Sequence, residues 1–257
     1  QFTRDMFHQA DKAMYLAKRR GRNRVCTWSM VQFEETVERI AGRPFASVVD
    51  RLNAMLDRAQ AFLGPTQWEH LTLHSQRVSD LAVRIGRQLN MESHDLDDLR
   101  VAALCHDLGK FLIPEDILAK LTPLSAQERA MIRRHAIEGC DMGLRLGMKS
   151  HLAGQIRHHR ARYDGQDSDE IVAGRTIPLG ARILNVADAF DAMTSNRPHR
   201  AAWSVQAALA ELQQGRGAQF DPAVVDAIQR LIGQDDSNDD YLDRHSPRSS
   251  EPAIAGQ

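Results

Sequence analysis

The stretch ALCHDLGKFLIP, residues 103–114, places three chemically active side chains at the end of an apolar run with helical character. His106 and Asp107 are adjacent, and Lys110 follows one helical turn later. A single histidine on an apolar face is usually a hydrogen-bonded core residue. Burying an imidazole, a carboxylate and an ammonium group together is costly unless they pair or bind a ligand. The group therefore predicts a functional site whose other members lie elsewhere in the chain.

Further histidines and one aspartate lie on other helical runs with apolar faces. These are His74 beside an apolar stripe, His135 after the segment MIRR, His158 and His159 at the end of the next run, and Asp188 within ARILNVADAFDAM. Imidazoles suit divalent transition metals, and the carboxylate of the His-Asp pair can give one oxygen to each of two ions. Each histidine alone is more often a core residue than a ligand. Together they favour a metal site over a core.

Composition excludes several other classes of protein. The chain has 257 residues, 42% of them hydrophobic, and a formal net charge of -1, which disfavours a dedicated nucleic-acid surface. An aromatic content of 5% disfavours a base-stacking platform. The three cysteines have no CxxC spacing, so neither a zinc knuckle nor a disulfide framework is expected. We find no apolar run long enough for a membrane span and expect a cytoplasmic protein.

The elements that must position these residues are helices. Apolar periodicity predicts helices near 45–62, 66–90, 94–108, 125–146, 149–161, 178–195, 204–214 and 221–232. Ser125 and Glu128 form a capping-box pattern, and Asp221 with Pro222 is typical of a helix start. Ahead of them, the first segment predicts one helix ending near Gly21 and a strand over RVCTW. A helix and a strand cannot bury a core of their own, so we interpret them as the end of another domain.

Two resemblances to known families follow from longer motifs. The segment ADKAMYLAKRRGRNRV resembles the closing helix and strand of a GGDEF diguanylate cyclase domain, without the cyclase signature loop. Residues from about 70 to 232 resemble an HD-GYP domain, the cyclic di-GMP phosphodiesterase branch of the HD metallohydrolase superfamily. The matching pieces are HSQRVSDLA, AALCHDLGK, IPEDILAK, IRRHAIEG, IPLGARILNVADAFDAMTSNRPHR and GAQFDPAVVDA.

The resemblances imply an all-α, multi-helix HD-type metallohydrolase bundle, preceded by a short helix-strand remnant of an upstream α/β domain. The implied domains are 1–28 as the end of a GGDEF-type domain, 29–65 as linker and helical lead-in, 66–232 as the HD-GYP-like domain, and 233–257 as a disordered acidic tail. The implied metal ligands are His74, His106, Asp107, His135, His159 and Asp188. They would hold two divalent ions, with iron or manganese expected and zinc or nickel as alternatives.

Substrate binding is implied at a second set of residues. Asp107 would bridge the ions that activate a water, and Lys110 would contact the scissile phosphate. Arg197 and Arg200 fit a phosphate clamp as well as they fit the surface of a helix end. The expected ligand is cyclic di-GMP or a related nucleotide. The expected partner is a GGDEF-type domain in the same or another chain; a homodimer is an option, and no DNA is expected.

The family motif HHExxDGxGYP is altered in this chain. Aligned without a gap on Asp164 and Gly165, it becomes HRARYDGQDSD, with Arg160 at the second histidine and Ala161 at the glutamate. His199 also replaces a family tyrosine. An alignment with one inserted residue would instead keep both His158 and His159 as ligands. His70 lies where trinuclear members carry glutamate, and a surface role is favoured for it.

Arg160 leaves two hypotheses open. A cation there is expected to disfavour the second metal ion and to pair with Asp107 or the substrate phosphate. The first hypothesis is a metal-dependent phosphodiesterase that hydrolyses cyclic di-GMP or a related phosphoester. The second is a non-catalytic module that binds nucleotide or a protein and regulates the attached cyclase domain. The intact His-Asp pair, lysine and Asp188 favour the enzyme, whereas the altered motif favours the regulator.

Overall fold

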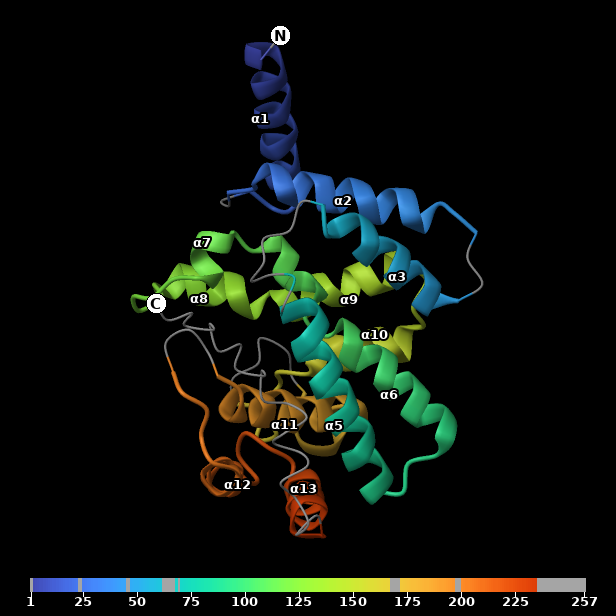
Figure 1. The fold of residues 1–257 in the computed structure, drawn as a ribbon, viewed down its shortest axis with the longest axis vertical. Coiled ribbons are helices and arrows are strands. Elements are labelled where there is room, and N and C mark those ends of the chain that lie inside the picture. Colours follow the sequence, from blue (N-terminus) through green and yellow to red (C-terminus); the bar gives the residue numbers. More distant parts are fainter. Residues whose placement is uncertain are drawn as a thin grey trace, which may run out of the picture.

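The computed structural model describes residues 2–22, 25–44, 47–61, 68, 70–166, 172–196 and 200–234. Regular secondary structure within these residues is helical, and no strand occurs among them. Figure 1 shows the helices as a stack, with α12 and α13 at the end opposite the amino terminus. None of the described helices is both long and apolar enough to cross a membrane. The expected all-α, multi-helix bundle is confirmed for the described residues.

The elements have the following bounds. They are α1 (Phe2–Arg19), α2 (Trp28–Ala41), α3 (Val48–Ala59), η1 (His70–His74), α5 (Ser75–Gln88), α6 (Ser93–Cys105), η2 (Leu108–Leu112), α7 (Glu115–Leu118), α8 (Ala126–Arg133), α9 (His135–Arg145), α10 (Ser150–His158), η3 (Gly174–Thr176), α11 (Leu179–Thr194), α12 (Val205–Gln214) and α13 (Pro222–Gln234). Here η1 is a π-helical turn, and η2 and η3 are 3-10 turns.

Local signals in the sequence explain several of these ends. Ser125 caps α8, and its backbone N–H donates to Glu128 Oε2 at 2.6 Å, which completes the predicted capping box. Asp221 Oδ1 accepts from the backbone N–H of Ala223 at 2.8 Å, and Pro222 is the first residue of α13. The helix predicted over 125–146 is two helices, α8 and α9, separated at Arg134.

The predicted strand is wrong within the described residues. Val25–Thr27 has no regular structure, and Trp28 begins α2, whose N-cap Thr27 accepts from the backbone N–H of Met30. The backbone N–H and C=O groups of a strand need a neighbouring strand as hydrogen-bond partner. The described residues contain no such strand. The sequence also did not predict α2, α7 or η2.

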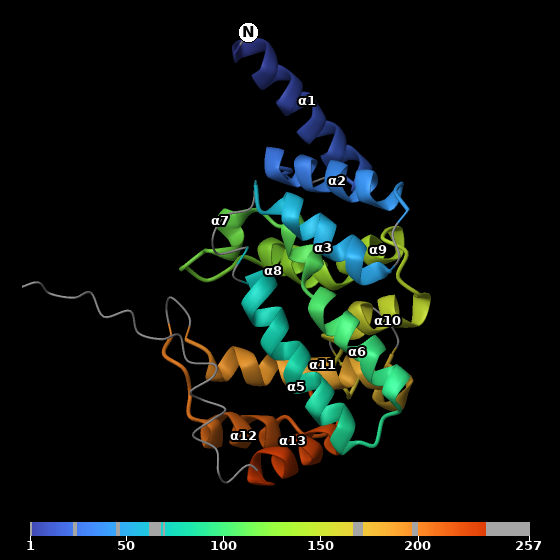
Figure 2. The same cartoon turned by 45° about the vertical axis from the view of Figure 1, so that its right-hand side comes forward.

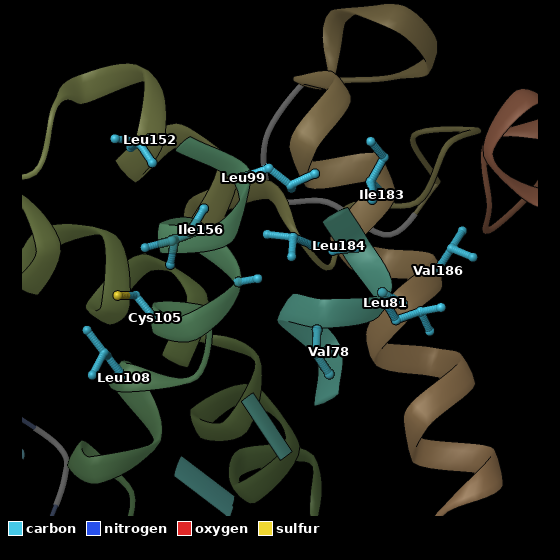
Figure 3. Close-up of a cluster of buried hydrophobic side chains, with 14 of the residues drawn as sticks. Val78, Leu81, Leu99, Cys105, Leu108, Leu152, Ile156, Ile183, Leu184 and Val186 are labelled. Carbon is cyan, nitrogen blue, oxygen red and sulfur yellow. The ribbon is translucent and has the colours of Figure 1, made fainter. Parts of the chain in front are cut away.

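One large core unites helices from most of the chain. It draws side chains from α2, α3, α5, α6, α9, α10, α11, α12 and α13. Figure 3 shows its central part, where α5, α6, α10 and α11 meet around residues such as Leu81, Leu99, Ile156 and Leu184. The helices α2 and α3, within the predicted linker and lead-in, are therefore packed on this core. The predicted domain boundaries themselves remain predictions, and residues 235–257 of the predicted tail lie outside the described residues.

The first helix stands apart from this core. α1 projects away from the stack and packs against α2 (Figures 1 and 2). Its apolar side chains Met6, Phe7, Met14 and Tyr15 are exposed. A small second cluster, built on Leu16, Met30 and Val31, joins the end of α1 to α2. The helix predicted for the first segment is thus observed, with these apolar side chains exposed, while its assignment to another domain remains a prediction.

Candidate metal centre

The packing of helices from across the chain brings the six predicted ligands together. His106 follows the last residue of α6, with Asp107 beside it, and His159 follows the last residue of α10. His135 begins α9, His74 lies where η1 passes into α5, and Asp188 lies within α11. α5 packs against both α6 and α11, while α9 packs against η2 and α10. We call these six residues the histidine-aspartate cluster.

One half of the cluster gathers around the Oδ2 atom of Asp107. His74 Nε2 lies 3.5 Å and His106 Nε2 lies 3.4 Å from this atom. The same two nitrogens lie 3.3 Å and 4.0 Å from Asp188 Oδ1. One ligand atom from each of His74, His106 and Asp188 can be chosen so that all lie within 4.8 Å of one another. We call this the first lobe.

The other half gathers around the second oxygen of the same carboxylate. His135 Nε2 lies 3.4 Å from Asp107 Oδ1 and 3.2 Å from His159 Nε2. Ligand atoms of His106, Asp107 and His159 also lie within 4.8 Å of one another. This second lobe shares Asp107 with the first. The carboxylate therefore has one oxygen directed to each lobe, which is the arrangement that a bridging ligand for two ions requires.

The cluster is buried and incompletely satisfied. His106 and His159 are fully buried, and Asp107 is 2% exposed. Among the described residues, His106 Nε2 and Asp107 Oδ1 find no hydrogen-bond partner. A buried polar atom without a partner costs about 1–3 kcal/mol, so such atoms are rare. Both orphaned atoms point into the cluster, and a metal ion would satisfy both.

The histidines differ in their protonation. Burial lowers the pKa of His106, and it lowers the pKa of His159 well below the usual range. Burial also lowers the pKa of His74, but hydrogen bonds to Asp188 and Asp191, together with the charges of Asp188 and Asp107, outweigh it and raise the pKa to about 9. Two rings are therefore ready to bind as neutral imidazoles, whereas His74 must lose a proton first.

The carboxylates are held in their charged form. Burial raises the pKa of Asp107, but His106, Lys110 and His135 outweigh it and hold that pKa well below its usual range. Burial also raises the pKa of Asp188, but the hydrogen bond and charge of His74 outweigh it and hold that pKa well below its usual range. Charged oxygens and neutral imidazoles form a ligand set that suits several divalent transition metals. The residues present thus fit the two-ion site that the resemblance implies, without selecting the metal.

Lys110 and Gly109 complete the His-Asp segment. Lys110 Nζ donates to Asp107 Oδ2 at 2.6 Å, and its side chain is 23% exposed, so its ammonium group reaches the edge of the cluster. A Cβ at Gly109 would lie 1.9 Å from the backbone oxygen of His135. Only glycine lets η2 approach α9 this closely, which brings Asp107 within reach of His135.

Arg160 contacts the cluster differently from the expectation. Its Nη1 lies 3.4 Å from Asp188 Oδ2, so it pairs with Asp188 and not with Asp107. Burial explains the difference, because the side chain of Asp107 is 2% exposed while that of Asp188 is 14% exposed and meets the half-exposed arginine. His159 lies in the cluster, whereas His158 lines a separate pocket of about 540 Å³ with Met91 and other residues. The geometry therefore supports the gap-free alignment.

Of the remaining predicted site residues, only Arg200 is described by the structure. Arg200 Nη2 donates to the backbone oxygen of Ala192, and its guanidinium lies over the Trp203 ring, 5.2 Å from the ring centroid. This contact with the end of α11 matches the surface interpretation, and its phosphate-clamp role remains a prediction. Arg197 and the side chain of His70 lie outside the described residues, as do 167–171 and His199.

Sequence reasoning missed two residues beside the cluster. Asp191 Oδ2 lies 2.7 Å from His74 Nδ1, and Asp191 Oδ1 accepts from Arg77 Nε at 2.6 Å. The available signal was spacing, since Arg77 follows His74 by three residues and Asp191 follows Asp188 by three. Residues three apart share a helix face, so both pairs could have been expected at one contact.

Comparison with known proteins agrees with this geometry. Residues 65–224 match the family described as HD domain. The cyclic di-GMP phosphodiesterase response regulator RpfG of Xanthomonas campestris is 38% identical over 158 residues, 60% of this chain and 42% of the relative. The 3'3'-cGAMP-specific phosphodiesterase 3 of Vibrio cholerae is 33% identical over 159 residues, 62% of this chain and 35% of the relative.

A solved structure supports the fold. An HDG"Y"P protein from Bdellovibrio bacteriovorus superposes with a TM-score of 0.56 at 16% identity, over 80% of this chain and 71% of that one. The chain spans less than half the length of either curated relative named above. The family match covers more than half of the chain and includes all six residues of the cluster. The chain therefore belongs to the HD domain family and is related to cyclic-dinucleotide phosphodiesterases.

Proposed function

We propose that this chain is a metal-dependent phosphodiesterase of HD-GYP type that hydrolyses cyclic di-GMP or a related phosphoester in bacterial second-messenger signalling. One observation carries the proposal: a buried cluster in which His106 Nε2 and Asp107 Oδ1 lack partners among the described residues. A structural core would satisfy these atoms or replace them with apolar groups. The names of the relatives supply the substrate class, with cyclic di-GMP and cyclic GMP-AMP as its two members.

The ligand roles follow from the two lobes. His74, His106 and Asp188 would hold one divalent ion, and His135 and His159 would hold the other. Asp107 would bridge them through its two oxygens. Ions bound there would supply Lewis acidity and a water of lowered pKa as the nucleophile. The burial of the cluster keeps bulk water from competing for these ligands.

The substrate would be held by cations at the rim. Lys110 contacts the bridging carboxylate and is partly exposed, so its ammonium can turn to a phosphate oxygen without leaving the site. Arg160 is half exposed on the other side, beside Asp188, and can pair with a second phosphate oxygen. Arg197 and Arg200 remain further candidates for phosphate contact.

An attached N-terminal domain would regulate this site. We keep the GGDEF-type assignment of residues 1–28 as part of the proposal, and the open apolar face of α1 supports a partner there. Arg20, at the end of α1, pairs with buried Glu34 on α2 and lies 2.7 Å from Glu138 on α9. Because α9 begins with His135, a shift of α1 would be transmitted to a ligand of the second lobe.

A second candidate function is a regulatory module without turnover. Arg160 favours it, because its pairing with Asp188 competes with a metal ion for that carboxylate. The two are separated by measuring metal content together with hydrolysis of cyclic di-GMP after manganese or iron is added. An enzyme contains bound metal and forms a linear dinucleotide product, and a chelator stops the formation of that product. A regulatory module binds cyclic di-GMP without product.

The two variants that test the site most directly are His106→Ala and Asp107→Asn. Both should lose most of the bound metal, and Asp107→Asn should lose it more completely because both lobes use its carboxylate. His151→Ala is a matched control, since His151 is an exposed histidine paired with Asp98 away from the cluster. Unchanged metal content in either cluster variant would contradict the assignment of the cluster as a metal site.

A further inference from the structure

All four imidazoles of the cluster are anchored through Nδ1. In three of them the anchor is the backbone oxygen three residues earlier, at 2.7 Å for His106, 2.5 Å for His135 and 2.7 Å for His159. The last carbonyls of a helix have no partner within the helix. These three rings follow α6, α8 and α10, so each helix end anchors its own histidine.

His74 cannot use this device. It lies where η1 continues directly into α5, so the carbonyls behind it belong to a continuing helix. Its Nδ1 instead meets a side chain from another helix, Asp191 Oδ2 on α11, at 2.7 Å. His74 is thus the one ring of the cluster held by a carboxylate.

Asp191 is itself fixed on both oxygens. It is 4% exposed, and Arg77 binds it twice, with Nε 2.6 Å from Oδ1 and Nη2 3.0 Å from Oδ2. A bidentate pair of this kind fixes the plane of the carboxylate. Since Arg77 lies one turn after His74, and Asp191 lies one turn after Asp188, the anchor and the ligands share the same contact between α5 and α11.

We propose that Asp191, held in place by Arg77, is a positioning residue that presets His74 as a metal ligand. With Nδ1–H directed to Asp191, Nε2 faces Asp188 and Asp107 at 3.3 and 3.5 Å. A carboxylate also makes the ring a stronger ligand than a carbonyl does. The inference rests on the proposed function, because it concerns one ligand of the first lobe.

The test uses zinc alone as the probe, titrated into metal-stripped protein by calorimetry. Asp191→Asn keeps the shape of the side chain but removes its charge, and zinc affinity should fall about 10–100-fold. Arg77→Met should cost a smaller factor, and its side chain is 23% exposed, so this variant tests the idea even where Asp191→Asn fails to fold. Asp226→Asn is the matched control, because Asp226 forms a bidentate pair with Arg216 on the surface.

A spectroscopic signature separates positioning from general weakening. In zinc-loaded protein labelled with ¹⁵N-histidine, the Nδ1–H signal of His74 should shift in Asp191→Asn. The signals of His106, His135 and His159 should stay in place, because backbone oxygens anchor them. A lower zinc affinity of Asp191→Asn combined with an unchanged His74 signal would overturn the inference.

The outcomes also separate this inference from the proposed function. Wild-type protein that binds zinc, together with a His106→Ala variant that does not, supports the metal site. Unchanged affinity in both Asp191→Asn and Arg77→Met would then overturn the positioning role alone. Wild-type protein that binds no zinc would overturn both.

Discussion

Arg160 pairs with Asp188, a proposed metal ligand, so removing the charge of Arg160 should tighten metal binding. Two unit charges 3.4 Å apart interact by about 1 kcal/mol at the dielectric constant of water and by about 5 kcal/mol at an effective dielectric of about 20. The side chain of Arg160 is 53% exposed, which places the pair near the lower end, at about 1–2 kcal/mol. Arg160→Met should therefore raise manganese affinity about 5–30-fold, measured by calorimetry on metal-stripped protein.

A free-energy difference of this size weakens metal binding but does not prevent it. The double variant Arg160→His with Ala161→Glu restores family residues and should raise both metal content and hydrolysis of cyclic di-GMP. Arg216→Met is the control, because it removes a charge from a surface pair with Asp226. Manganese affinity that stays the same or falls in Arg160→Met, relative to this control, would refute the competition. Rapid hydrolysis of cyclic di-GMP by the wild-type protein with two ions bound would exclude the regulatory module as its function.

Three further predictions concern neighbouring residues. Lys110→Ala should keep the fold and the metal but weaken binding of cyclic di-GMP, with Lys120→Ala as the control; loss of metal with retained nucleotide binding would be the wrong outcome. Gly109→Ala should destabilise the protein by about 1–3 kcal/mol or more in urea unfolding, because its Cβ would lie 1.9 Å from a backbone oxygen, and an unchanged midpoint would contradict this close approach. The raised pKa of His74, about 9, stabilises the metal-free fold fully below about pH 6.5, and that contribution is lost as the pH rises through about 9. Metal must displace the same proton, so zinc binding near pH 7.5 should release about one proton more in wild-type protein than in His74→Gln, as calorimetry in buffers of different ionisation enthalpy would show.

Most of the helices could be predicted because their signals are local. Apolar periodicity and caps located α6, α10, α11, α12 and α13 to within a few residues of the predicted ends, whereas α5 begins at Ser75 and its predicted start was residue 66. The helix α2 was not predicted, although its buried residues Met30, Phe33, Val37 and Ile40 have helical spacing. Only the structure shows that this helix packs on both α1 and the main core.

The candidate site was predicted in its members but not in its geometry. Whether His158 joins His159 in the cluster depends on how the end of α10 is rotated against the second lobe, which only packing decides. The spacing of Asp191 from Asp188 places both on one helix face, but only the packing of α5 on α11 shows that this face meets His74 and Arg77. Arg160 pairs with Asp188 because Asp188 is more exposed than Asp107, and an alignment does not show how exposed a side chain is.

The most direct test of the account is hydrolysis of cyclic di-GMP by the purified chain, measured by chromatography of the linear product. Wild-type protein loaded with manganese or iron should form the linear product. Chelated protein and the Asp107→Asn variant should form none. His151→Ala, folded and outside the cluster, should keep the activity. Product that forms equally after chelation, or equally in Asp107→Asn, would contradict a metal-dependent phosphodiesterase. Metal-loaded wild-type protein that binds cyclic di-GMP and releases no product would contradict the enzyme and leave the regulatory module.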